Sequence, residues 1–287
     1  RTMNNLIVRT LTGAVFALLV LGAIFLDDRI ASLMFGAFML MGIIEFYKLF
    51  EHHKEVEIDW RLGTFFVILV YGIGISAIYQ IIPTVFIYCT APLIFILALT
   101  ELWRRKKNPI LNVAVLFMGA FYIGYPFYLL TVTNLTDSPT NWTDIENTDV
   151  FFRMPITAML ILLVWTNDTF AYLIGRLLGK KKLFERISPN KTWEGTIGGI
   201  TFSVLLGVVF GLYTNNGNDF IYWIVCALII AACAIFGDLF QSMMKRSLNI
   251  KDSGSLLPGH GGILDRFDAL LFAVPFFVAW TWIYNYL

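Results

Sequence analysis

The sequence predicts an all-α, polytopic integral membrane protein with about nine transmembrane helices. Hydrophobic residues make up 58% of the 287-residue chain and charged residues only 14%, which excludes an ordinary soluble globular protein. Apolar runs long enough to cross a hydrocarbon core of about 30 Å recur along the whole chain. No internal repeat and no long linker interrupts them, so we expect a single membrane domain over 1–287.

The apolar runs give the elements in order. We place the helices at 6–26, 30–50, 62–82, 84–103, 110–131, 154–175, 196–213, 220–240 and 267–286. The runs within 1–131 are expected to form a scaffold with oligomer contacts, and those within 154–287 to carry the functional site. Three cysteines, Cys89, Cys226 and Cys233, fall inside runs and are expected to be packing residues rather than disulfides or metal ligands.

The charges of the connecting loops predict the orientation. Lysine and arginine gather at the N-terminus and in the loops after the second, fourth, sixth and eighth runs, whereas the 132–153 loop has four acidic residues against Arg153. Because basic loops stay in the cytoplasm, we expect a cytoplasmic N-terminus and an outside C-terminus. For the basic run 104–107, this ordinary bias is a sufficient explanation.

The segment 242–268, SMMKRSLNIKDSGSLLPGHGGILDRFD, has the most informative chemistry, and we call it the signature segment. Four fixed cations suit the oxygens of a polyphosphate. Two carboxylates three residues apart suit a hard divalent cation that also binds those oxygens. The cations are Lys245, Arg246, Lys251 and Arg266, and the carboxylates are Asp265 and Asp268.

The signature segment resembles that of the phosphatidate cytidylyltransferases, S-x-x-K-R-x4-K-D-x-G-x3-P-G-H-G-G-x2-D-R-x-D, at every fixed position. A second block, 167–199, resembles the same family, and together the two blocks cover about a fifth of the chain. The resemblance implies transfer of CMP from CTP to phosphatidate, which gives CDP-diacylglycerol and pyrophosphate in phospholipid biosynthesis. It also implies a homodimer, for which the residues themselves supply no argument.

Asp168 lies inside the sixth apolar run. An ionisable residue at membrane depth costs several kcal/mol unless it is paired or hydrated, so its default interpretation is functional. Helical spacing places Asp168 on one face with Tyr172, Gly175 and Arg176, and this face leads into a basic loop. A buried residue that joins helices by hydrogen bonding is the alternative.

Asp238 closes the eighth run, and helical spacing puts Ser242 and Lys245 on its face. We expect Asp238 to converge with Asp265 and Asp268 on a Mg²⁺ ion, with Asp168 as a further candidate ligand. A second, monovalent ion is compatible with this site. The alternative is an interfacial Asp238 paired with Lys245 or Arg246.

The glycines of the signature segment let the chain turn and bring backbone N–H groups near an anion. His260 between them is equally suited to contact a phosphate and to cap a turn. In the second block, Ser188 is expected to cap the seventh helix with Pro189 at its first position, which aims Lys191 at phosphate. Arg266 is expected to bind phosphate, with an ion pair to a carboxylate as the alternative. The glycines of the seventh run are most simply explained by close helix packing.

The chemistry requires no catalytic base, because a phosphate monoester with a second pKa of about 6 is already a nucleophile at neutral pH. Metal and cations would act by positioning and electrostatics. The expected catalytic residues are Asp238, Asp265, Asp268 and Lys245, and the expected phosphate-binding residues are Arg176, Lys191, Ser242, Arg246, Lys251, His260 and Arg266.

We expect CTP, phosphatidate and membrane lipid as partners, no nucleic acid, and a site on the cytoplasmic side of a bacterial inner membrane. The alternatives are a CTP-dependent polyprenol or phytol kinase and an ion-coupled secondary transporter. The transporter predicts a repeat symmetry that the sequence lacks.

Overall fold

The computed structural model describes residues 2–51, 53–135, 154–213, 219–250, 253–254 and 261–286. Eight helical segments of this described part are long and apolar enough to cross a membrane. The chain is therefore a helical integral membrane protein, as the sequence predicts. The first predicted run lies in helix α1 (Thr2–Leu26), whose shorter apolar stretch is Thr12–Leu26, so the count of nine stays a prediction.

The chain divides into two compact units. Residues 1–135 and 248–266 form the N-terminal unit, and residues 136–247 and 267–287 form the C-terminal unit. Most of the signature segment therefore groups with the N-terminal helices rather than with the helices that precede it.

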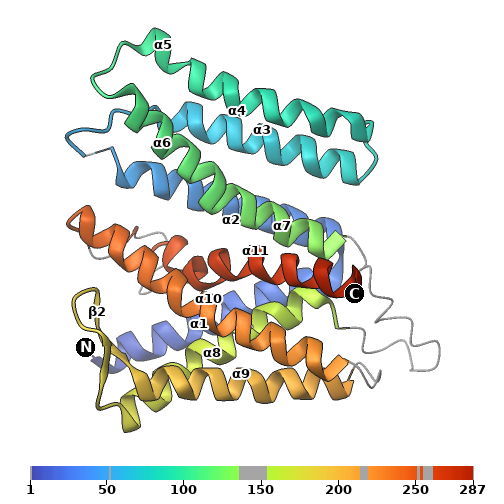
Figure 1. Cartoon of the computed structure of the whole chain (residues 1–287), viewed down its shortest axis with the longest axis vertical. Helices are drawn as coiled ribbons and strands as arrows, with labels where there is room; N and C mark the ends of the chain where they lie inside the picture. The colour runs from blue at the N-terminus through green and yellow to red at the C-terminus, as the bar shows by residue number, and fades with distance from the viewer. Residues whose placement is uncertain are drawn as a thin grey trace. The chain divides into compact units, whose positions relative to one another are not determined.

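In the N-terminal unit, α1 packs on α2 (Asp28–Leu49), which also contacts α3 (Trp60–Ile78) and α7 (Tyr125–Leu135) (Figure 1). Its core gathers on α2, where Phe35, Ile43, Phe46 and Tyr47 are completely buried. The Tyr47 hydroxyl donates a hydrogen bond of 2.8 Å to the carbonyl of Leu116, so even this buried polar group is satisfied.

Two predicted helices of this unit are irregular. The run at 84–103 consists of a 3₁₀ turn, η1 (Thr84–Cys89), followed by α4 (Thr90–Leu99) and α5 (Glu101–Arg104). Pro92 has no N–H and its ring would clash with the carbonyl four residues earlier, so the α-helix begins just before it. The run at 110–131 is α6 (Pro109–Gly119), a π-helical turn η2 (Ala120–Gly124) and α7, whose second residue is Pro126.

The basic run at 104–107 has structural partners. Arg104 pairs with the buried Glu101 and donates to the carbonyl of Glu57 at 2.7 Å. Lys106 donates to the Glu57 carboxylate at 2.8 Å, and this hydrogen bond lowers the pKa of Glu57. The two contacts of Glu57 attach the loop after α2 to the end of α5 and the residues that follow it.

The C-terminal unit contains α8 (Ile156–Leu178), α9 (Trp193–Tyr213), α10 (Asp219–Ser247) and most of α11 (Leu264–Tyr286). Helix α9 lies alongside both α8 and α10 (Figure 1). Glycines make this approach close: a Cβ at Gly199 would lie 2.7 Å from the carbonyl oxygen of Asn167, and one at Gly207 would lie 2.7 Å from that of Trp223. The packing interpretation of these glycines is confirmed.

The second block departs from the all-α prediction. Strands β1 (Lys182–Phe184) and β2 (Ser188–Thr192) form an antiparallel hairpin between α8 and α9. Ser188 therefore lies in a strand, and its expected role as the cap of a helix that starts at Pro189 is wrong. Thr192 takes the capping role, since its hydroxyl accepts the N–H of Gly195 at 3.2 Å.

All three cysteines are free, as predicted. Cys226 and Cys233 are buried in α10, whereas Cys89 is exposed. The expected packing role therefore fits the two cysteines of α10.

Candidate active site

Charged side chains of the C-terminal unit gather at one place, although they come from four elements. Asp168 lies on α8, Lys191 on β2, Asp238 and Lys245 on α10, and Asp268 on α11. The three carboxylates interact electrostatically with one another, Asp168 also with Lys191, and Asp268 also with Lys245. We call these five residues the carboxylate cluster.

The closest contact in the carboxylate cluster is an ion pair between Lys191 and Asp238. Its carboxylate and ammonium side chains are 37% and 25% exposed, so the pair lies at a surface and remains accessible to a ligand. The Ser242 hydroxyl is 3.5 Å from the same carboxylate, as the helical spacing predicts. Asp238 thus forms an ion pair with Lys191 of the second block, a partner that the sequence alternative, Lys245 or Arg246 of its own helix, did not include.

Asp168 is exposed on α8, and its neighbour Asn167 is buried. The Asn167 side-chain amide donates to the Asp168 carboxylate at 3.3 Å, while the backbone of Asn167 packs against Gly199 of α9. The glycine packing of α8 and α9 therefore sets the position of the residue beside Asp168. Asn167 is a supporting residue whose role is visible only once these helices are packed.

The hairpin that carries Lys191 is fixed where it meets the helices. The Trp193 N–H donates to the carbonyl of Lys181 at 2.9 Å, and the Glu194 carboxylate accepts the N–H groups of Lys180 and Lys181 at 3.0 and 3.2 Å. These bonds hold the basic turn and the start of α9 together. Lys191 is therefore presented by a defined strand rather than by a loose loop.

Asp265 and the start of α11 belong to the N-terminal unit. Asp265 Oδ2 accepts the backbone N–H groups of Ser253 and Gly262, each at 3.1 Å, so this carboxylate joins two points of the signature segment. Sequence reasoning missed a second acid here: Glu45 of α2 is 6% exposed and accepts the N–H of Leu264 at 2.9 Å. Its signal in the sequence was an ionisable residue inside an apolar run.

The other predicted site residues are placed as follows. Arg176 is exposed at the end of α8, with Nη1 3.4 Å from the Tyr172 hydroxyl. Arg246 and Arg266 are exposed, and each has an interaction partner. Lys251 and His260 lie outside the described residues.

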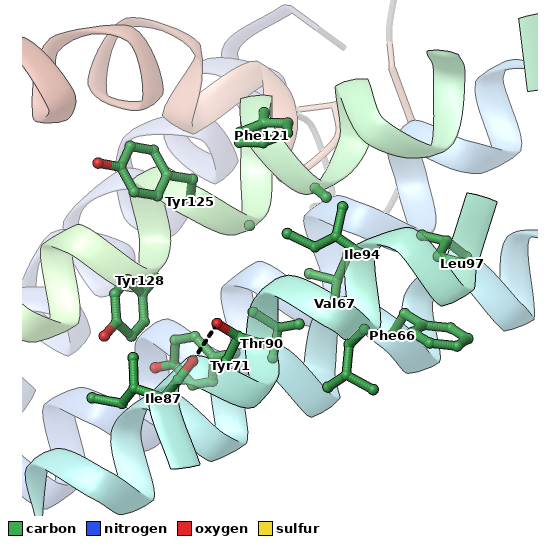
Figure 2. Close-up of a pocket in the computed structure, with 15 residues that line it drawn as sticks. Phe66, Val67, Tyr71, Ile87, Thr90, Ile94, Leu97, Phe121, Tyr125 and Tyr128 are labelled. Carbon is green, nitrogen blue, oxygen red and sulfur yellow. Dashed lines mark hydrogen bonds between the residues drawn. The ribbon is translucent and has the colours of Figure 1, made fainter. Parts of the chain in front are cut away.

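A separate cavity of about 250 Å³ lies in the N-terminal unit (Figure 2). It is lined by apolar and aromatic side chains of α3, α4 and the α6–α7 region, among them Phe66, Ile94, Phe121 and Tyr128, and its described lining contains no charged side chain. This cavity is unsuited to a triphosphate, so the carboxylate cluster remains the candidate active site.

Among the described residues, no three histidine, cysteine, aspartate or glutamate side chains form a group that could hold a metal ion by themselves. The carboxylate cluster nevertheless sets three carboxylates against two ammonium groups, which leaves an excess of negative charge. Mg²⁺ is usually bound by one or two carboxylates together with substrate phosphates and water. The donor set therefore fits a metal that arrives with a phosphate ligand.

Comparison with known proteins gives a family match over most of the chain. A model of the cytidylyltransferase family matches residues 7–284. The chain is 38% identical over 166 residues to a phosphatidate cytidylyltransferase of Bacillus subtilis, which covers 58% of this chain and 56% of that protein. It is 41% identical over 133 residues to a phosphatidate cytidylyltransferase of Haemophilus influenzae, an alignment that covers 45% of this chain and 46% of that protein. It is 46% identical over 114 residues to one of Staphylococcus epidermidis, and this alignment covers 40% of this chain and 44% of that protein. The chain thus spans about half the length of the curated relatives it matches.

Proposed function

The chain belongs to the cytidylyltransferase family, and we propose that it transfers CMP from CTP to phosphatidate, giving CDP-diacylglycerol and pyrophosphate. The observation that carries the proposal is the family match across residues 7–284, which includes the complete signature segment. The carboxylate cluster supports it, because a lysine of the second block pairs there with an aspartate of the helix that leads into the signature segment.

The proposed reaction is a direct displacement. An oxygen of the phosphatidate phosphate attacks the α-phosphorus of CTP, the bond from that phosphorus to the β-phosphate oxygen breaks, and pyrophosphate leaves with the electron pair. Two anions must meet, so positive groups lower the barrier by positioning and charge stabilisation. The residues proposed to bind the phosphates are Arg176, Lys191, Ser242, Lys245, Arg246, Lys251, His260 and Arg266.

Mg²⁺ is the proposed cofactor, and when bound it would neutralise the phosphate oxygens. Asp238 and Asp268 would supply its carboxylate oxygens, with Asp168 as a further ligand, and a second, monovalent ion is compatible with the proposal. Lys191 would then exchange its pairing with Asp238 for a phosphate oxygen, which keeps both charges compensated. A direct role of Asp265 at the ion stays a prediction, alongside its contacts within the signature segment.

The proposed setting is a bacterial inner membrane with the site on the cytoplasmic side, where CTP is found. The alternating loop charge supports a cytoplasmic N-terminus and an outside C-terminus. The acyl chains of the substrate would stay in the lipid while the headgroup reaches the carboxylate cluster. The proposal includes a homodimer, for which the resemblance to the family is the argument.

Two labels on CTP test the function. Purified protein in phosphatidate-containing detergent micelles is given CTP labelled at the α-phosphate or at the γ-phosphate. Cytidylyl transfer puts the α-label into lipid and leaves the γ-label in pyrophosphate. A lipid kinase would put only the γ-label into lipid, and a transporter would put in neither, so either result would overturn the proposal.

A further inference from the structure

Glu45 is an acid that the proposed chemistry does not use, yet it is buried against the signature segment. Besides accepting the N–H of Leu264 at 2.9 Å, its Oε2 lies 3.5 Å from the Ser253 hydroxyl, which donates to it. Leu264 is the first residue of α11, where backbone N–H groups lack partners within the helix. A carboxylate there satisfies one of them and interacts favourably with the helix dipole.

Two glycines of the signature segment make room for this carboxylate. A Cβ at Gly262 would lie 2.5 Å from Glu45 Oε2, and a Cβ at Gly254 would lie 2.7 Å from Glu45 Cδ. Both distances are shorter than any ordinary contact of a methyl group. Glu45 and these glycines therefore fit together as one unit.

Asp265 completes the arrangement from the other direction. Its carboxylate binds the N–H groups of Ser253 and Gly262, the residues whose side chain or Cα also faces Glu45. An acid of α2 and an acid of α11 thus both bind Ser253, and each binds one further residue near the start of α11: Glu45 binds Leu264 and Asp265 binds Gly262. Of these two acids, only Glu45 belongs to an element outside the signature segment, so its loss removes the support that comes from α2.

We propose that Glu45 is a positioning residue: it holds residues 253–254 and 262–264 of the signature segment in the geometry that cytidylyl transfer requires. It acts through Ser253, Gly254, Gly262 and Leu264 rather than by touching substrate. The inference rests on the proposed function for its effect on turnover. Its structural part can be tested without that function.

The first test compares Glu45→Gln with Glu101→Gln. Glu101 is the matched control because it is also buried, at 4%, but it pairs with Arg104 and Asn112 instead of the signature segment. We expect Glu45→Gln to lower kcat for CMP transfer by about 10- to 100-fold per folded molecule, the usual effect of a misplaced catalytic segment. Equal kcat losses in the two variants would overturn the proposal.

The second readout does not need activity. Ser253, which is 6% exposed, is replaced by Cys in a Cys89→Ser background, since Cys89 is the exposed native cysteine. We expect a maleimide to label this cysteine slowly. Adding Glu45→Gln should raise the labelling rate several-fold, whereas adding Glu101→Gln should leave the rate unchanged. Unchanged labelling with Glu45→Gln would overturn the positioning role. Absent CMP transfer in the wild-type protein, with faster labelling in Glu45→Gln, would instead refute only the proposed function.

Gly254→Ala with native Glu45 covers the case in which Glu45→Gln does not fold, and a coupling experiment extends it. Gly254→Ala introduces the methyl group that Glu45 excludes, so it should speed labelling of the Ser253→Cys site by itself. In a Glu45→Ala background the same methyl group has space, so the two effects should be less than additive. Full additivity, or no effect of Gly254→Ala, would show that Glu45 does not position the segment.

Discussion

Replacing Gly199 by Ala tests the packing that places Asn167 beside Asp168. The new Cβ would lie 2.7 Å from the Asn167 carbonyl oxygen, 2.8 Å from its Oδ1 and 3.0 Å from the Cβ of Ala171. Ordinary carbon contacts are about 3.5–4.0 Å, and two of these atoms belong to backbone or Cβ positions that cannot rotate away. Helices α8 and α9 must therefore move apart.

We expect this overpacking to cost about 1–3 kcal/mol of unfolding free energy. At about 2–4 °C per kcal/mol, the thermal midpoint in detergent should fall by several degrees. The rate of CMP transfer should fall by a larger factor than the yield of folded protein, because the displaced residue, Asn167, is the neighbour of Asp168.

The matched control is Gly72→Ala in α3, where a Cβ would meet nothing within 4 Å. Alanine is the better helix former by about 1 kcal/mol, so this variant should keep or slightly raise the midpoint. Thermal unfolding of both variants, followed by circular dichroism in the same detergent, makes the comparison. Equal midpoints for Gly199→Ala and Gly72→Ala would refute the close packing of α8 on α9.

Three further outcomes are expected. Asp268→Asn keeps the side-chain volume but removes the charge, so turnover should fall by at least about 100-fold with the folded yield nearly unchanged; near-normal activity with added Mg²⁺ would make Asp268 structural. Arg266→Lys keeps the charge but loses the planar fork, so a bidentate phosphate role predicts a clear loss of kcat/KM for CTP at unchanged Mg²⁺ dependence, and wild-type kinetics would contradict it. Cysteines at Asn141 and Asn216 should react with an impermeant maleimide added outside cells and one at Lys181 should not, and the reverse pattern would invert the topology.

The transmembrane helices were predictable because length and hydropathy are local properties of the sequence. The run at 220–240 lies within α10, and the glycines of the seventh run pack helices as expected. The break before α4 also had a local cause in Pro92, although apolar length alone predicted one helix there. The length of an apolar run decides whether a segment can cross a membrane, but it does not decide whether the segment forms one continuous helix.

The connections between elements were less predictable because they depend on partners far away in sequence. Ser188 and Pro189 form a good local signal for a helix start, yet pairing with β1 places them in a strand and moves the cap to Thr192. Likewise, the spacing on α10 related Asp238 to Ser242, whereas its ion pair with Lys191 required the hairpin. Glu45 contacts residues more than 200 positions away, so its role followed only from the packed structure.

The central claim is that Asp238 and Asp268 hold a divalent cation together with the phosphates of CTP. Mn²⁺ in place of Mg²⁺ allows its binding to be followed by electron paramagnetic resonance, independently of turnover. In the presence of CTP, we expect Asp238→Asn and Asp268→Asn to weaken Mn²⁺ binding by at least about tenfold, because each removes a charged ligand. The control Asp59→Asn, at the N-cap of α3, should leave it unchanged. If Mn²⁺ binds the two site variants and the wild-type protein with equal affinity, the carboxylate cluster is not the metal site.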